Sequence, residues 1–99
     1  MRISHAQAHE IRQAAQQLAG ADVQTRVFGS RLDDNVAGGD LDLVLEIPHP
    51  VDNPAWLAAQ VSARVSRALA GRKVDVLLVA PNLQRLPIHD IALAKGQAL

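Results

Sequence analysis

The sequence predicts a small α/β (α+β) domain in which helices pack on one face of a mixed three-stranded sheet. Segments with helical apolar spacing, near residues 4–18 and 53–70, alternate with segments that have the strand period of two. A strand–helix–strand unit runs from Asp40 to Val79, and such units favour a parallel strand pair joined by a crossover helix. The length of 99 residues suits a single domain over residues 1–99.

The overall composition argues against several classes of protein. The formal net charge is +0, unlike that of a general nucleic-acid binder or of a protein that binds anionic membranes. There is no cysteine, which excludes disulfides and cysteine-ligated zinc. No apolar run approaches the ~18 residues of a membrane-spanning helix, and the N-terminus lacks the apolar core of a secretion signal. We therefore expect a soluble, cytoplasmic protein.

The first predicted elements are a helix and a short strand. Ser4 caps the helix and Gln7 stands in capping-box position three residues later. The helix runs to about Leu18 and ends at Gly20. Its buried face contains Ile11, Ala14, Ala15 and Leu18. The strand over residues 23–28 follows, because polar and apolar residues alternate there.

A glycine-rich connection leads to the second predicted strand. Gly29 breaks the first strand, Ser30 starts a short helical turn, and the pair Gly38-Gly39 predicts a tight turn. From Asp40 onward the residues alternate between two faces. One face carries Leu41, Leu43, Leu45 and Ile47, and the other carries Asp40, Asp42, Val44 and Glu46. We expect the first face to be buried and the second to be open.

The remaining elements are a second helix, a third strand and a last helix. Asn53 caps the second helix with Pro54 in its first turn, and Gly71 ends it. The third strand, residues 73–79, is apolar apart from one aspartate, which predicts a central strand buried on both sides. The last helix spans residues 88–94. The apolar residues Leu86, Ile88, Ile91, Leu93 and Leu99 form a contact surface for a partner or pack internally.

Three carboxylates are candidate metal ligands. Asp40 and Asp42 point to the same face of their strand, and Asp75 lies near the start of the third strand. If these strands are adjacent and parallel, the carboxylates meet at the same end of the sheet. Oxygen ligands of this kind suit Mg²⁺, and two-metal sites serve phosphoryl and nucleotidyl transfer. An isolated Asp-x-Asp is also common on a solvated strand face. The functional interpretation therefore depends on all three carboxylates together.

The corner between the first two strands suits a phosphate. Gly29 lets the backbone approach a phosphate closely, and Ser30 adds a hydroxyl at the start of a helical turn. Arg31 and Arg26 could neutralise the rest of a triphosphate. Alone, a Gly-Ser corner is more often an ordinary turn. The combination with the carboxylates favours a nucleotide site.

These motifs resemble a known superfamily. Phe28-Gly29-Ser30-Arg31, followed by Gly39-Asp40-Leu41-Asp42-Leu43, resembles the nucleotidyltransferases typified by DNA polymerase beta, and in particular the minimal nucleotidyltransferases, the MntA-like antitoxins. The resemblance implies the nucleotidyltransferase fold. It also implies that Gly29 and Ser30 contact phosphate and that Asp40, Asp42 and Asp75 bind two Mg²⁺ ions. Such proteins pair with a HEPN-family toxin and use ATP to transfer AMP onto a toxin tyrosine.

Two other functions stay open at the level of sequence. The chain could be a stoichiometric binding antitoxin with weak or no catalysis, although a pure binder has no need of three carboxylates. It could also transfer a nucleotide to RNA or to a small molecule, and the neutral charge weakens the RNA version. A chain of this length has little room to grip an acceptor, so we expect a partner protein to supply it.

Overall fold

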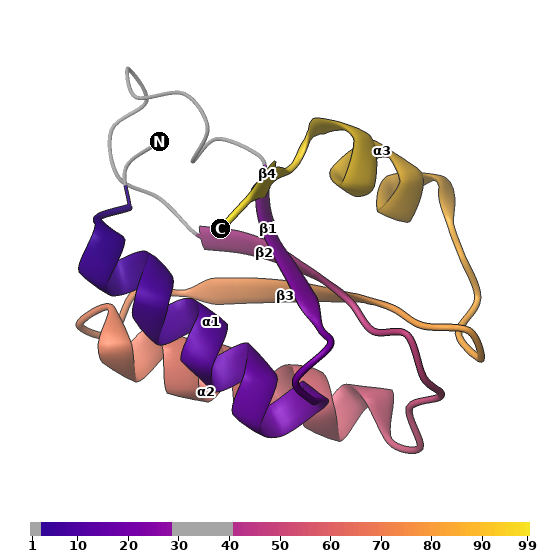
Figure 1. The fold of residues 1–99 in the computed structure, drawn as a ribbon, viewed down its shortest axis with the longest axis horizontal. Coiled ribbons are helices and arrows are strands. Elements are labelled where there is room, and N and C mark those ends of the chain that lie inside the picture. Colours follow the sequence, from indigo (N-terminus) through magenta and orange to yellow (C-terminus); the bar gives the residue numbers. More distant parts are fainter. Residues whose placement is uncertain (1–2, 29–40) are drawn as a thin grey trace.

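A computed structural model describes residues 3–28 and 41–99 of the chain (Figure 1). The order of helices and strands agrees with the sequence prediction over these residues. The elements are α1 (His5–Ala19), β1 (Gln24–Phe28), β2 (Leu41–Glu46), α2 (Pro54–Ala68), β3 (Val74–Val79), α3 (Pro87–Lys95) and β4 (Gln97–Ala98). The predicted short helical turn at Ser30 and the Gly38-Gly39 turn lie outside the described residues.

The strands form a mixed sheet in the order β3-β2-β1-β4. β1 is antiparallel to both of its neighbours, whereas β2 and β3 are parallel, as the strand–helix–strand unit predicted. The predicted strand count of three is wrong, because β4 adds a fourth. This strand has only two residues, which pair with Arg26 and Val27 of β1. A pairing of that length leaves no periodic pattern in the sequence.

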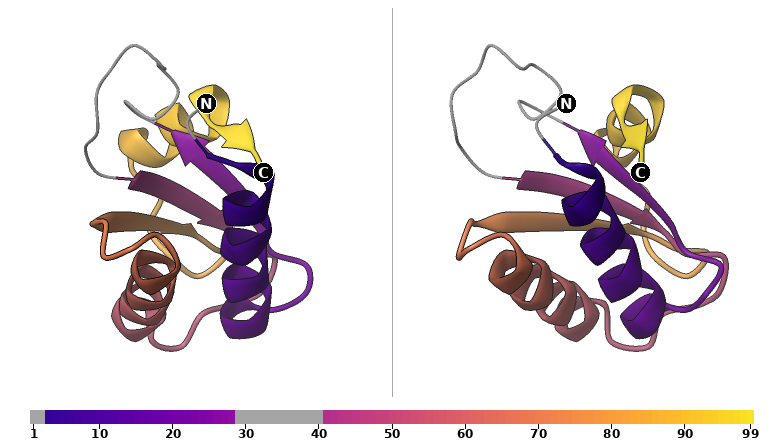
Figure 2. Two further views of the ribbon diagram at one scale, coloured as in Figure 1. Left: turned by 90° about the vertical axis from the view of Figure 1, so that its left-hand side faces the viewer. Right: turned by 60° about the vertical axis from the view of Figure 1, so that its left-hand side comes forward.

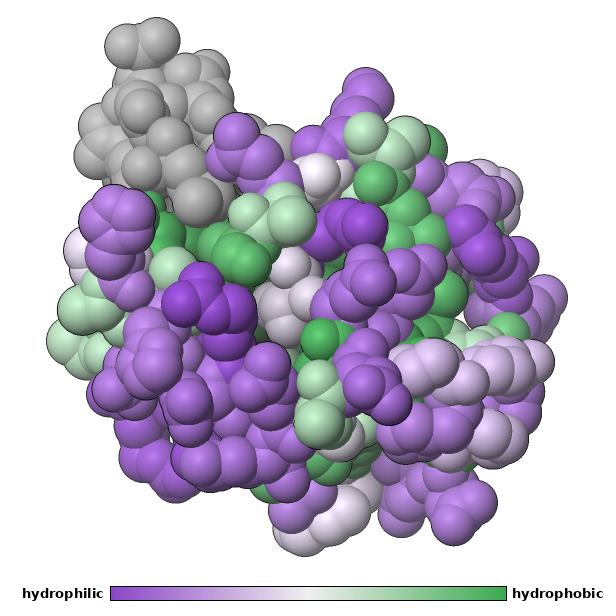
Figure 3. All heavy atoms as spheres, in the orientation of Figure 1, coloured by the Kyte–Doolittle hydropathy of each residue, from purple (hydrophilic) through white to green (hydrophobic). Residues whose placement is uncertain are grey.

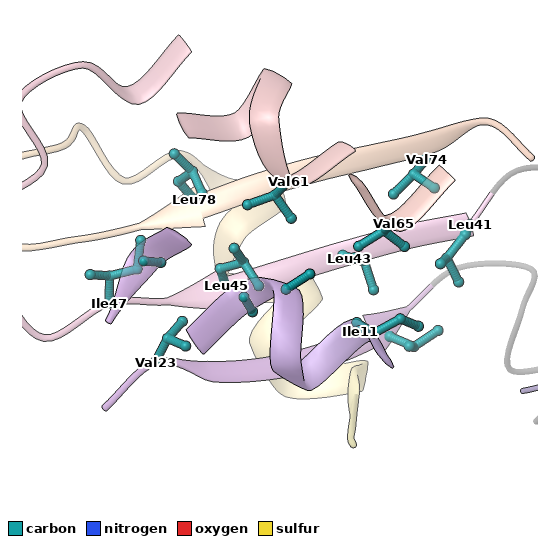
Figure 4. Packing of buried hydrophobic residues seen from close by; sticks show 14 of the residues in the cluster. Ile11, Val23, Leu41, Leu43, Leu45, Ile47, Val61, Val65, Val74 and Leu78 are labelled. Carbon is teal, nitrogen blue, oxygen red and sulfur yellow. The ribbon is translucent and has the colours of Figure 1, made fainter. Parts of the chain in front are cut away.

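The two long helices cover one face of the sheet, but the prediction that the helices pack on one face is wrong for α3, because the chain after β3 returns across the other face (Figure 2). Figure 2 shows α1 and α2 side by side beneath the sheet, with α3 on the opposite side. The core lies between α1, α2 and the sheet, and Figure 4 shows its side chains pointing toward one another. Among its most deeply buried members are Ile11 of α1, Leu41, Leu43 and Leu45 of β2, and Val61 and Val65 of α2.

Two expectations about burial in the sheet are wrong. β3 is an edge strand and not a central one, and Leu77 and Val79 remain partly exposed. The second face of β2 is not open along its whole length, because α3 crosses the sheet there. Val44 and Ala92 are both 0% exposed and stand outside the main core cluster, which places a second, small apolar contact under α3. The apolar run of β3 therefore does not identify a central strand, because an edge strand with helices near both of its faces can have the same composition.

The helix starts follow the predicted caps. The Ser4 hydroxyl oxygen accepts from the Gln7 backbone N–H at 3.1 Å, and the Gln7 side chain accepts from the Ser4 N–H at 3.1 Å. In α2, the Asn53 side chain accepts from the Trp56 N–H at 3.2 Å. These bonds satisfy N–H groups that the first helical turn leaves without intrahelical partners. Within the described residues, no helix is long and apolar enough to cross a membrane.

Asn82 joins the loops that follow β2 and β3. Its amide nitrogen donates to the Val51 carbonyl at 2.8 Å, and its amide oxygen accepts from the Val51 N–H at 2.9 Å. Val51 is buried, so its polar backbone groups depend on this side chain in place of water. Asn82 thereby ties the chain entering α2 to the end of the β3 segment.

Replacing this side chain is expected to destabilise the fold. Asn82→Ala should lower the free energy of unfolding by about 1–3 kcal/mol, because both backbone groups of Val51 lose their partner. Asn82→Asp should cost at least as much, since a carboxylate oxygen then faces the Val51 carbonyl. Urea unfolding measures both, with the exposed neighbour Gln84→Ala as the control. If the Asn82→Asp protein is as stable as the wild type, this account is contradicted.

Candidate metal and nucleotide site

Asp42 and Asp75 are direct partners in the register of the parallel strands β2 and β3. Leu41 and Val74, which precede them, belong to the core on the side of α1 and α2. Because side chains alternate along a strand, both carboxylates point to the other face, where the two strands begin. Neighbouring strands lie about 4.8 Å apart, so two carboxylates in register are within reach of one cation. The predicted meeting of these two residues is confirmed.

This end of the sheet differs from its middle. Asp75 is exposed and Asp42 is half-buried, whereas Val44, two residues further along β2, is fully buried beneath α3. The end of the sheet face that carries the two carboxylates is therefore open to solvent at Asp75. Phe28, the last residue of β1, pairs with Asp42 on its other side. Three strands thus contribute one residue each to a row at this edge.

The other predicted site residues lie outside the described part of the chain. They are Gly29, Ser30, Arg31 and Asp40. The described residues on either side of this segment are Phe28, which ends β1, and Leu41, which begins β2. β2 carries Asp42, and β1 pairs with β2. The phosphate corner and the Asp40 ligand stay predictions from the sequence.

The described carboxylates fit part of a magnesium site. Mg²⁺ takes oxygen ligands and is commonly held by one or two carboxylates together with substrate phosphates and water. Asp42 and Asp75 supply two carboxylates of the right chemistry on one face. Within residues 3–28 and 41–99, no group of three or more His, Asp or Glu side chains could hold a metal ion. A complete site needs further ligands, and Asp40 is the sequence candidate.

Arg26 does not point toward the carboxylate pair. Its guanidinium lies 4.0 Å from a Glu46 oxygen and donates to the Gln24 side chain at 3.4 Å. Both contacts direct the side chain toward the opposite end of β1 and β2. The interpretation of Arg26 as a triphosphate contact is therefore wrong in this conformation. Glu46 shares the face of Asp42 but lies about 13 Å further along the strand, too far to bind the same ion.

A cavity of about 520 Å³ lies at the opposite end of the sheet. Glu46 and Val79, the last residues of β2 and β3, line it together with His89 of α3 and the loop over residues 80–85. No pattern in the sequence indicates this cavity, because its walls come from segments far apart in the chain. Its lining includes neither Asp42 nor Asp75, so this cavity and the carboxylate pair are separate features at opposite ends of the sheet.

The chain was compared with protein-family models, with curated proteins and with solved structures, and none of them matches it.

Proposed function

We propose that this protein is a magnesium-dependent nucleotidyltransferase that uses ATP to transfer AMP to a partner protein, a HEPN-family toxin. The observation that carries the proposal is the register pairing of Asp42 with Asp75 on the accessible part of one face. The two side chains start on the same face of neighbouring strands, so one cation is within reach of both. Carboxylate oxygens are ligands that Mg²⁺ prefers. The sequence motif around Ser30 and Asp40 supplies the nucleotide half of the argument.

The proposed reaction joins the acceptor hydroxyl to the α-phosphorus of ATP. A new oxygen–phosphorus bond forms, the bond between the α-phosphorus and the bridging oxygen breaks, and pyrophosphate leaves. Asp40, Asp42 and Asp75 would hold magnesium, which when bound neutralises charge on the phosphate oxygens. Asp75 would orient the acceptor hydroxyl and take its proton. We place this reaction in the cytoplasm, the compartment expected from the sequence.

A stoichiometric binding antitoxin is the second candidate, and the surface of α3 favours it. Leu86, Ile88 and Ile91 are each 44–49% exposed. Figure 3 shows hydrophobic side chains over the part of the molecule where α3 lies. Leu93 and Leu99 are half-buried, and Leu99 packs against the core. The predicted contact surface is thus split into an exposed part and a part that packs internally.

A labelling reaction tests the proposal. The protein is mixed with Mg²⁺, α-labelled ATP and the product of its neighbouring gene, and the Asp42→Asn variant is run beside it. The matched control is Glu46→Gln, the equivalent change on the same strand and face but at the far end. We expect label on the partner with the wild type and with Glu46→Gln, and a loss of about 10²-fold or more with Asp42→Asn.

The same experiment separates the two candidates. A complex that forms without label, in wild type and Asp42→Asn alike, would show a binding antitoxin and would reject the catalytic proposal. Label on an RNA in the mixture, with none on the protein, would reject the acceptor class and keep the chemistry. Omission of Mg²⁺ should abolish the label in every sample.

A further inference from the structure

The single tryptophan of the chain lies on the side of α2 that faces away from the sheet. Trp56 is 61% exposed, more than any other large apolar side chain among the described residues. The buried Val61 and Val65 mark the side of α2 that packs on the sheet, and Trp56 lies about 140–180° around the helix from them. Figure 2 shows α1 and α2 as the outermost layer on this side of the sheet among the described elements. An exposed tryptophan of this kind is typical of an interaction site.

Trp56 begins a stripe of residues along α2, which we call the outer stripe. A surface hollow of about 440 Å³ follows it, and its walls include Trp56, Ala59, Gln60, Ala63 and Arg67. Counted from Trp56, the others follow after three, four, seven and eleven residues, which is the spacing of one side of a helix. The large side chains stand at the two ends and the alanines between them. Small side chains at the centre of a contact allow a second helix to approach closely.

The charges of the outer stripe limit what can cover it. α2 contains no acidic residue, and its basic residues are Arg64 and Arg67. Arg64 donates to the Gln17 side chain of α1, whereas no ion pair or side-chain hydrogen bond of the described residues involves Arg67, which is exposed. An arginine is attracted to the face of an aromatic ring within about 6 Å, and tryptophan is the best such ring. In one chain Trp56 and Arg67 are eleven residues apart, about 16 Å along the helix, so they cannot meet each other.

A second copy of the chain, with its α2 antiparallel, brings these two residue types together. Trp56 of each copy then faces Arg67 of the other, which is the reciprocal contact that a two-fold interface requires. The centre of the pairing falls where Gln60 of one copy meets Ala63 of the other. The two Arg67 side chains are about 16 Å apart in this arrangement, beyond the Debye length of about 8 Å at physiological ionic strength. A parallel pairing would place Arg67 against Arg67, so charge selects the antiparallel one.

We infer that two copies of this chain associate through the outer stripes of α2, antiparallel, with Trp56 of each copy against Arg67 of the other. This inference goes beyond the proposed function and does not depend on it. Asp42 and Asp75 point to the opposite face of the sheet, so the dimer leaves them accessible. A contact between one pair of helices is small for a stable interface, and we expect a dissociation constant of about 10–100 µM.

Sedimentation velocity of the whole chain, from about 1 to about 500 µM, tests the inference. Because Trp56 is the single tryptophan, its fluorescence emission in the same samples should move to shorter wavelength as the dimer forms. We expect Trp56→Ala and Arg67→Ala each to raise the dissociation constant about tenfold or more, and Arg67→Lys, which keeps the cation, to change it less. The matched controls are Leu86→Ala, an exposed apolar residue of α3, and Arg72→Ala, an exposed arginine outside α2. Both controls should dimerise like the wild type.

A double variant tests the specific contact. Trp56→Ala combined with Arg67→Ala should weaken the dimer little more than the worse single variant, because both substitutions remove the same interaction. Losses that simply add would overturn the pairing of Trp56 with Arg67. A dimer that Leu86→Ala dissociates and Trp56→Ala does not would place the interface at α3 and overturn the inference.

A chain that stays monomeric over the whole concentration range would also overturn the inference. Polyuridylate and polyglutamate are then added to the monomer as probes of the outer stripe. A shift of the Trp56 emission with polyuridylate would assign the stripe to nucleic acid, and a shift with polyglutamate alone would assign it to an acidic protein partner. Either result replaces the second copy as the occupant of this surface.

Discussion

Asp75→Asn is expected to lower the rate of AMP transfer by about 10²- to 10⁴-fold, the range that a positioned general base contributes. The substitution keeps the size of the side chain but removes the charge and the ability to take a proton. Asp75 is exposed and lies at the beginning of an edge strand, so the change leaves the core intact. Single-turnover labelling of the partner protein, with the site saturated in Mg²⁺ and ATP, measures the chemical step directly.

The same variant should be as stable as the wild type, within about 0.5 kcal/mol, when Mg²⁺ is absent. Asp75 is exposed at the start of an edge strand, and surface substitutions of this kind usually have effects no larger than that. A substitution that lowers activity but leaves stability unchanged or increased is typical of a residue that serves function and not the fold. Urea unfolding in a chelator measures this, with Asp52→Asn, at an exposed loop position, as the control. A clear loss of stability would show that Asp75 serves the fold, and unchanged transfer would remove it from the reaction.

The elements that were predicted well are those set by local chemistry. The Ser4–Gln7 capping box and the Asn53 cap depend on residues within one helical turn, and both form as expected. The parallel pairing of β2 with β3 followed from the connection through α2, since a crossover helix leads the chain back in the same direction. Periodicity and connectivity were sufficient for this part of the fold.

The features that were not predicted depend on how separate segments meet. β4 is too short to have a period, and its pairing with Arg26 and Val27 is visible only in three dimensions. The position of α3 across the sheet decides that Val44 is buried, and nothing in the alternation of β2 indicates this. The edge position of β3 was missed because its run is apolar apart from Asp75, and an edge strand that is only partly covered on one face can be as apolar as a central strand.

The candidate site was predictable to the extent that sheet register determines it. Asp42 and Asp75 could be brought together from the sequence, because each holds a defined place in one of two parallel strands. The direction of Arg26 could not, since it depends on Glu46 and Gln24 as neighbours in the sheet. The phosphate corner at Ser30 and the ligand Asp40 rest on the motif and its resemblance.

Leu43→Ala is expected to have the largest effect on stability, a loss of about 2–5 kcal/mol. Leu43 is 0% exposed, lies in the middle of the inner strand β2, and belongs to the core cluster beneath α1 and α2 (Figure 4). Truncation leaves a cavity that rigid strands on either side cannot close. Since domains of this kind unfold with only about 5–15 kcal/mol, the loss is a large part of the total.

Leu86→Ala is the matched control, because it deletes the same atoms at a position that is 45% exposed. We expect a change within about 0.5 kcal/mol there, as for surface substitutions in general. Leu43 follows Asp42 in β2 but points to the opposite face, and the backbone ladder that aligns Asp42 with Asp75 does not involve its side chain. Below its lowered melting temperature, Leu43→Ala should therefore still transfer AMP. Two results would contradict this separation of core and site. One is a loss of less than about 1 kcal/mol in the free energy of unfolding of Leu43→Ala, measured in urea, and the other is a folded Leu43→Ala protein that does not transfer AMP.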